Sequence, residues 1–191
     1  EDVQIDRQQA ISIMQSVVAF LDSDTQPLLN GAEDGVYERQ TPSYRTAGQP
    51  LASVSELRSV AGVTPEIYAA LAPFVTVWPR EGSVLNVLTA SATVLRSLPV
   101  DDLLEPLPKE EGLRLVEARA EGFIFSVETL LEDALFSGPG GDDLAALLGE
   151  RSDWFLLSAS VEIAERELRL YSVLERERGS VSSRYRSQGE L

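Results

Sequence analysis

The stretch WFLLSASVEI, residues 154–163, decides the fold class of this chain. Polar and apolar residues mostly alternate along it, and they alternate again in ELRLYSVL, residues 167–174, after a short connection. Alternation with a period of two is typical of strands that bury one face. The two stretches therefore predict an antiparallel hairpin, to which residues 180–185 add a third strand. A hairpin alone is only marginally stable in water, so this one needs another element to pack against.

The residues before the hairpin carry a different pattern. Apolar residues recur at helical spacing over residues 7–21, which predicts a first helix. Further helices are predicted over residues 53–60, 90–98, 109–120, 126–136 and 142–149, and another begins at Pro65. Short extended segments are predicted at residues 74–78 and 84–87. Helices followed by strands predict an α+β fold. We expect a helical body over residues 1–150 and β-strands over residues 151–191.

Residues 53–66 have the rhythm of a helix-hairpin-helix. Ser53 precedes Glu56 by three residues, which is a capping-box pattern, and Gly62 marks the end of the first short helix. Pro65 stands at the first position of the next helix. The sequence therefore predicts helix-hairpin-helix-like elements within residues 53–98.

Composition restricts the chemistry that is available. The 191 residues include no cysteine and no histidine, which removes disulfides, thiolate metal sites and His-dependent catalysis. The formal net charge is -15, which opposes nucleic-acid binding and favours hard cations. The chain starts without an initiator Met and has no signal peptide and no apolar run long enough to span a membrane. We expect a processed or truncated fragment whose anchor, if any, lies upstream.

The loop over residues 22–50 contains the sharpest chemical pattern. If Asp22 is the first position of a calcium loop, Asp24, Gln26, Leu28 and Glu33 take positions three, five, seven and twelve, the oxygen-bearing positions of an EF-hand. Asp34 adds a neighbouring charge. The sixth position of an EF-hand loop is glycine but is Pro27 here, and no periodic helix follows Glu33. Two interpretations remain: a cation site of oxygen ligands with a different fold, or an acidic turn exposed to solvent.

Other motifs carry no identifiable chemistry. The glycine-rich run at 138–141 is followed by Asp142 and Asp143, and no lysine follows as a phosphate-binding loop requires. The neighbouring carboxylates Glu110 and Glu111 diverge on a helix rather than converge on one substrate. We therefore predict no catalytic residues.

Residues 31–77 resemble a known family. The matching positions are Gly31-Ala32-Glu33-Asp34, Tyr37, Pro42, Tyr44-Arg45, Pro50-Leu51, Ser55-Glu56-Leu57-Arg58, Val60, Gly62-Val63-Thr64-Pro65-Glu66, Tyr68 and Leu71-Ala72-Pro73-Phe74-Val75-Thr76-Val77. Together with an Asp-x-Asp element at residues 22–24 and the ending at 170–176, they are similar to minor pseudopilin K (general secretion pathway protein K) of type II secretion. One departure is Leu88, where the family's Asn-x-Asn-Thr-Ala stretch has its second asparagine.

This resemblance implies a pilin-like β-sheet with a large inserted helical domain. It also implies a non-enzymatic subunit at the tip of the pseudopilus. This subunit would assemble with minor pseudopilins I and J during export of folded proteins and would bind calcium in a structural role. Asp22, Asp24, Glu33 and Asp34 match the acidic positions of the family's calcium region. The expected location is the periplasm. The full-length protein is expected to be anchored in the bacterial inner membrane by an N-terminal helix that is absent from this chain. Exported proteins are expected as further binding partners.

Two other functions fit parts of the sequence. A helix-hairpin-helix protein for DNA binding or uptake would use the Gly62 turn, but Arg58 is the one nearby cation and Glu56 and Glu66 flank the turn. A metal-assisted hydrolase would use Asp22, Asp24 and Glu33, and would also need an open coordination position and a substrate cleft.

Overall fold

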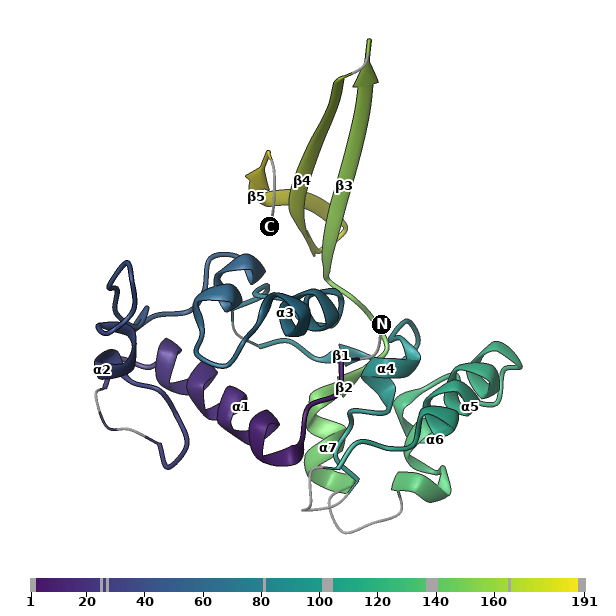
Figure 1. Ribbon diagram of the computed structural model, residues 1–191. Helices are drawn as coiled ribbons and strands as arrows, with labels where there is room; N and C mark the ends of the chain where they lie inside the picture. The colour runs from purple at the N-terminus through teal and green to yellow at the C-terminus, as the bar shows by residue number, and fades with distance from the viewer. Residues whose placement is uncertain are drawn as a thin grey trace. The chain divides into compact units, whose positions relative to one another are not determined.

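The computed structural model describes residues 3–24, 26, 28–80, 82–100, 105–136, 141–164 and 166–188. It has the predicted α+β character, with helices distributed between residues 7 and 147 and a β-sheet over residues 154–187 (Figure 1). Contacts divide the chain into two compact units, one of residues 1–80, 158–172 and 186–191, and one of residues 81–157 and 173–185. Within the described residues, none of the helices combines the length and the apolar character needed to cross a membrane. The predicted domain boundary at residue 150 stays a prediction.

The first unit begins with helix α1 (Arg7–Leu21), which has the predicted bounds. Asp6 caps it by accepting a hydrogen bond from the backbone N–H of Gln9 at 2.7 Å. The remaining helical elements before residue 80 are α2 (Asp34–Tyr37), the 3-10 helix η1 (Val54–Ser59), α3 (Pro65–Leu71) and the 3-10 helix η2 (Ala72–Phe74). A core of buried side chains joins these elements: Phe20, Ala32, Tyr37, Leu51, Leu57 and Val60.

The predicted hairpin forms between η1 and α3. The Ser53 side chain accepts from the N–H of Ser55, and Glu56 accepts from the N–H of Ser53, so both halves of the capping box are present. Gly62 has a φ of 85°, in the left-handed region that glycine adopts without strain. Thr64 caps α3, whose first residue is Pro65. Local signals therefore determine this turn.

The second unit contains a small parallel sheet and several helices. Its elements are β1 (Leu85–Asn86), α4 (Ala92–Leu95), α5 (Lys109–Ala120), α6 (Val127–Leu131), the 3-10 helix η3 (Ala134–Phe136), α7 (Gly141–Leu147) and β2 (Leu148–Gly149). Strand β1 pairs with β2, with Leu85 opposite Leu148. Its core includes Val87, Leu95, Leu115 and Leu130. Leu88 is the residue at which this chain departs from the Asn-x-Asn-Thr-Ala stretch. Its backbone N–H donates to the Asn86 side chain at 3.0 Å.

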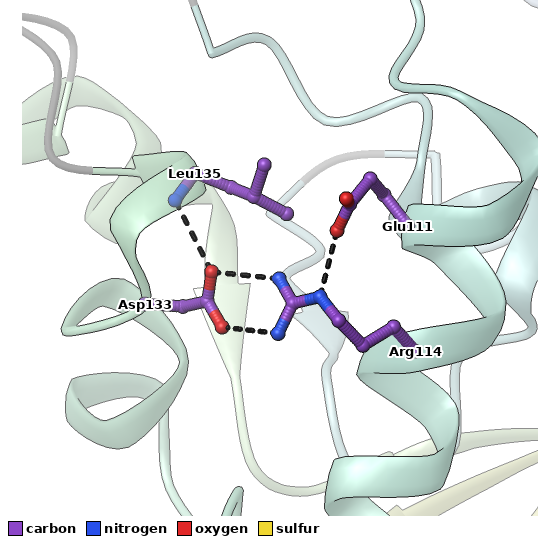
Figure 2. Close-up of polar contacts among 4 residues, drawn as sticks. All are labelled: Glu111, Arg114, Asp133 and Leu135. Carbon is purple, nitrogen blue, oxygen red and sulfur yellow. Dashed lines mark hydrogen bonds and ion pairs between the residues drawn. The ribbon is translucent and has the colours of Figure 1, made fainter.

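An ion pair joins two segments of this unit. Arg114 on α5 donates from both terminal nitrogens to the Asp133 carboxylate, at 2.9 Å each, and from Nε to Glu111 at 2.7 Å (Figure 2). Asp133 also accepts from the N–H of Leu135 at 3.1 Å, which starts the turn of η3. The Arg114 bonds lower the pKa of Asp133 and raise that of Arg114.

The C-terminal strands form one antiparallel sheet, as predicted. They are β3 (Trp154–Ile163), β4 (Arg166–Glu177) and β5 (Ser180–Ser187), and they lie in the order β3-β4-β5. Ser160 donates to Glu167 at 2.7 Å, so these polar side chains share one face. Residues of the other parity on β3, from Phe155 to Ile163, are apolar and mostly exposed in this chain. The sheet is amphipathic, which explains the alternation seen in the sequence.

Several sequence expectations need correction. Phe74 ends a 3-10 helix instead of beginning an extended segment, and the helix expected over 90–98 is limited to α4. The helix expected over 126–136 breaks into α6 and η3, because Asp133 binds Arg114 and the N–H of Leu135. Asp142 lies inside α7 rather than before it, and residues 148–149 form a strand. Residues 138–140 of the predicted glycine-rich break lie outside the described residues.

Candidate metal-binding site

The two aspartates of the site lie where α1 ends. The N–H of Asp22 donates to the Val18 carbonyl at 3.0 Å, and an extended backbone at Asp22 then turns the chain out of the helix. Asp24 accepts a hydrogen bond from the N–H of Gln26 at 2.7 Å, which forms an Asx turn. Asp22 is thus the C-cap residue of α1, and Asp24 follows two residues later. Pro27, at the sixth position of the predicted calcium loop, lies outside the described residues.

The chain then folds back along α1 and brings Glu33 to the same place. Asn30 donates from its N–H to the Gln15 side chain at 2.8 Å, and its carbonyl accepts from the Ser12 hydroxyl at 3.0 Å. Glu33 follows as the residue before α2, and its side chain makes no capping hydrogen bond. Contacts to the side of α1, rather than a continuous calcium loop, therefore position Glu33.

Three carboxylates converge at this place. One oxygen from each of Asp22, Asp24 and Glu33 lies within 4.8 Å of the corresponding oxygens of the other two. Both carboxylate oxygens of Glu33 and the Oδ1 atom of Asp22 are buried and accept no hydrogen bond from the protein. Burial raises the pKa of Glu33, and the charges of Asp22, Asp24 and Asp34 raise it further. Buried, unpartnered anions in such proximity are costly unless a cation compensates them.

Asp34 has a different environment from the other three predicted residues. Its Oδ1 atom accepts from both the N–H and the hydroxyl of Thr46, at 2.9 Å each. These bonds lower the pKa of Asp34, so its carboxylate is the stable form. Sequence reasoning missed Thr46, since it lies outside the spacing of a calcium loop and carries no distinctive signal of its own.

The donor set suits a hard cation. It consists of carboxylate oxygens, which calcium and magnesium prefer, and it contains no nitrogen or sulfur atom of the kind that selects transition metals. The arrangement is not that of an EF-hand, because the helix after Glu33 is α2, of only four residues. The residues present therefore fit a structural cation held by a helix terminus and a returning loop.

The hairpin of the DNA-binding alternative uses its polar groups internally. The guanidinium of Arg58 lies 4.6 Å from the centre of the Tyr68 ring. Glu56 accepts from the N–H groups of Ala52 and Ser53, at 2.9 and 3.0 Å. Its capping carboxylate would repel a phosphate at the same place.

Comparisons with known proteins agree on one family. The family profile described as type II secretion system (T2SS), protein K, matches residues 1–80. Type II secretion system protein K of Klebsiella pneumoniae is 33% identical over 183 residues, which cover 92% of this chain and 55% of that protein. The Pectobacterium carotovorum protein K is 29% identical over 168 residues, covering 86% of this chain and 50% of its own length. This chain thus spans about half the length of these relatives.

A solved structure extends the likeness to the whole fold. It is the crystal structure of the GspK-GspI-GspJ complex from the type 2 secretion system of enterotoxigenic Escherichia coli. The match has a TM-score of 0.76 and 25% sequence identity, and it covers 98% of this chain and 66% of that chain. Motifs, fold and relatives therefore agree that the chain belongs to the type II secretion system protein K family.

Proposed function

We propose that this chain is the periplasmic part of a non-enzymatic minor pseudopilin, which assembles with minor pseudopilins I and J at the tip of the pseudopilus and supports export of folded proteins. The observation that carries the proposal is the match of nearly the whole chain to a structure of a complex that contains I and J. Anchoring of the full-length protein in the bacterial inner membrane, and contacts with exported proteins, belong to the same proposal and rest on family membership.

A structural role fits the chemistry of the described residues. A groove of about 710 Å³ in the first unit is lined by apolar side chains from α1, η1 and α3, and Arg80 is the one titratable residue among its described lining residues. Such a lining offers no acid–base pair that could act on a substrate. The hydrolase alternative would need reactive groups beside the three carboxylates.

The assembly experiment uses this chain with the soluble domains of I and J from the same bacterium. The three proteins are purified separately, mixed, and followed by size-exclusion chromatography with light scattering. Coelution of this chain with I and J at the mass of a ternary complex supports the tip-subunit proposal. Separate elution at micromolar concentrations would refute assembly through this part of the protein, and coelution with double-stranded DNA would favour the hairpin alternative.

We further propose that Asp22, Asp24 and Glu33 bind a structural calcium ion, with Asp34 adding negative charge at the edge of the site. Support comes from the convergence of the three carboxylates and from the buried, unpartnered oxygens of Asp22 and Glu33. When bound, the ion supplies positive charge that replaces mutual repulsion with attraction. The protein supplies the positions of the oxygens and the partial exclusion of water around them.

Thermal melting tests this part of the proposal. A ligand that binds only the native state raises the melting temperature with the logarithm of its free concentration. Calcium should therefore raise it relative to chelator, and magnesium should do so less. The effect should disappear in Asp24→Ala and persist in Asp143→Ala, which removes an exposed carboxylate on α7. No shift at millimolar calcium in the unmodified chain would refute the ion site.

A further inference from the structure

We propose that Asp34 and Thr46 form a latch that positions Glu33 for the cation, so that Asp34 acts on the site as a positioning residue. This inference rests on the calcium site proposed above. Two observations carry it. A series of hydrogen bonds connects the two segments that bear the ligands, and the buried, unpartnered oxygens of Asp22 and Glu33 lie where those segments meet.

The first connection ties the returning segment to the end of α1. The carbonyl of Phe20, two residues before Asp22, accepts from the N–H groups of Ala47 and Gly48 at 3.0 and 3.1 Å. A Cβ atom added at Gly48 would lie 3.6 Å from the Asp22 carbonyl oxygen. Residues 46–48 therefore pass directly beside the segment that bears Asp22.

The second connection ties the same segment to the start of α2. Thr46 donates twice to Oδ1 of Asp34, once from its backbone and once from its hydroxyl. Asp34 is the neighbour of Glu33 in sequence, so its position restricts that of Glu33. The route from α1 through residues 46–48 to Asp34 thus holds Glu33 close to Asp22 by bonds that involve neither of those two carboxylates.

Electrostatics explains why such a latch is needed. Without a cation, the carboxylates of Asp22, Asp24 and Glu33 repel one another, and the loop that carries Glu33 would relax outward. A preformed site binds its ligand more tightly because less ordering remains to be done on binding. Loss of the latch should therefore weaken calcium binding although no ligand oxygen is removed.

Isothermal titration with calcium measures the effect in four variants. Thr46→Val removes the hydroxyl bond and is expected to weaken binding ~3- to 10-fold, the usual effect of one hydrogen bond. Thr46→Ser retains the hydroxyl and should bind like the unmodified chain. Asp34→Asn should weaken binding at least as much as Thr46→Val. The double variant should bind no more weakly than Asp34→Asn, because the two residues act through one interaction.

A second measurement is independent of calcium. In chelator, the amides of Thr46, Ala47 and Gly48 should exchange hydrogen faster in Asp34→Ala than in the unmodified chain, since alanine has no side-chain oxygen to accept the two Thr46 hydrogen bonds. Equal exchange in the two proteins would overturn the latch.

The titration also separates failure of the latch from failure of the ion site. If the unmodified chain binds calcium and Thr46→Val binds it equally well, while Asp34→Asn loses more than about 100-fold, Asp34 is itself a ligand and the inference is wrong. If the effects of the two substitutions add, the residues do not act together and the inference is again wrong. If the unmodified chain binds no calcium, the ion-site proposal fails, and this inference fails with it.

Discussion

Glu33 and Asp22 present carboxylate oxygens within 4.8 Å of one another, and neither oxygen pair is fully satisfied by the protein. The two residues lie on different segments, one at the end of α1 and one before α2. Their proximity is therefore a property of the fold rather than of adjacent sequence. It predicts opposite effects of one substitution with and without calcium.

Glu33→Gln should stabilise the chain in chelator and destabilise it in calcium. In chelator the amide removes a buried charge that Asp22, Asp24 and Asp34 repel, and a gain of about 1 kcal/mol would raise the melting temperature by roughly 2–4 °C. In millimolar calcium the variant lacks a ligand and should melt below the unmodified chain. Differential scanning calorimetry measures both effects. Glu121→Gln, at an exposed position, should change neither, and a less stable Glu33→Gln in chelator would contradict the repulsion.

The sequence predicts the elements that local interactions determine. Helices α1 and α5 have the expected bounds, and the capped turn around Gly62 forms as expected. Strands β3 to β5 follow from alternation because one face of the sheet is apolar. In each case the signal lies within the segment itself.

The remaining features depend on contacts between distant residues. Strand β2 exists because residues 148–149 pair with β1, far earlier in the chain. Helix α4 ends at Leu95, and the next residue, Arg96, exchanges hydrogen bonds with the backbone of Leu107. At the candidate site, the spacing indicates the acidic residues, three of which converge, but it gives no signal for Thr46. Binding of calcium itself stays a prediction.

Tyr37 should connect α2 to the turn between η1 and α3 whether or not calcium is present. Tyr37 is 1% exposed, and its hydroxyl accepts from the N–H of Ala61 at 3.2 Å. Tyr37→Phe leaves that N–H without its acceptor and should cost about 1–2 kcal/mol in urea unfolding. Tyr44→Phe is the matched control, because its hydroxyl donates to Ser59 at an exposed position where water can replace it. Equal losses in the two variants would contradict the role of Tyr37.

Gly112 should be intolerant of a side chain, because α4 packs directly against it. A Cβ atom there would lie 2.5 Å from the carbonyl oxygen of Ala92, which is backbone and cannot rotate away. Gly112→Ala is therefore expected to destabilise the second unit by about 1–3 kcal/mol despite the higher helix propensity of alanine. Gly35→Ala is the control, since a Cβ there meets nothing within 4 Å, and it should be neutral or stabilising. Urea unfolding of both variants decides the matter, and a neutral Gly112→Ala would show that the helices can separate.

The Arg114–Asp133 pair should make stability depend on pH below the physiological range. The side chain of Asp133 is 17% exposed, and its pKa lies below the ordinary value near 3.8, chiefly because Arg114 donates to the carboxylate (Figure 2). A lowered native pKa means that the unfolded chain binds the proton first. The contribution of the Asp133 carboxylate to the free energy of unfolding is therefore complete when the pH is above the ordinary pKa of an aspartate. It is lost as the pH falls through the lowered pKa of the native state.

Asp133→Asn should accordingly cost about 1–3 kcal/mol at pH 7, the usual range for a charge-assisted bond. The cost should shrink toward zero in acid, where the unmodified carboxylate also becomes protonated. Urea unfolding across the pH range measures the difference. Glu111→Gln serves as control, because Glu111 makes one bond to the same arginine from a more exposed side chain, 34% against 17%, and should lose less than about 1 kcal/mol. A cost for Asp133→Asn that stays constant from pH 7 into acid would mean that packing, rather than the charge on Asp133, stabilises the break between α6 and η3.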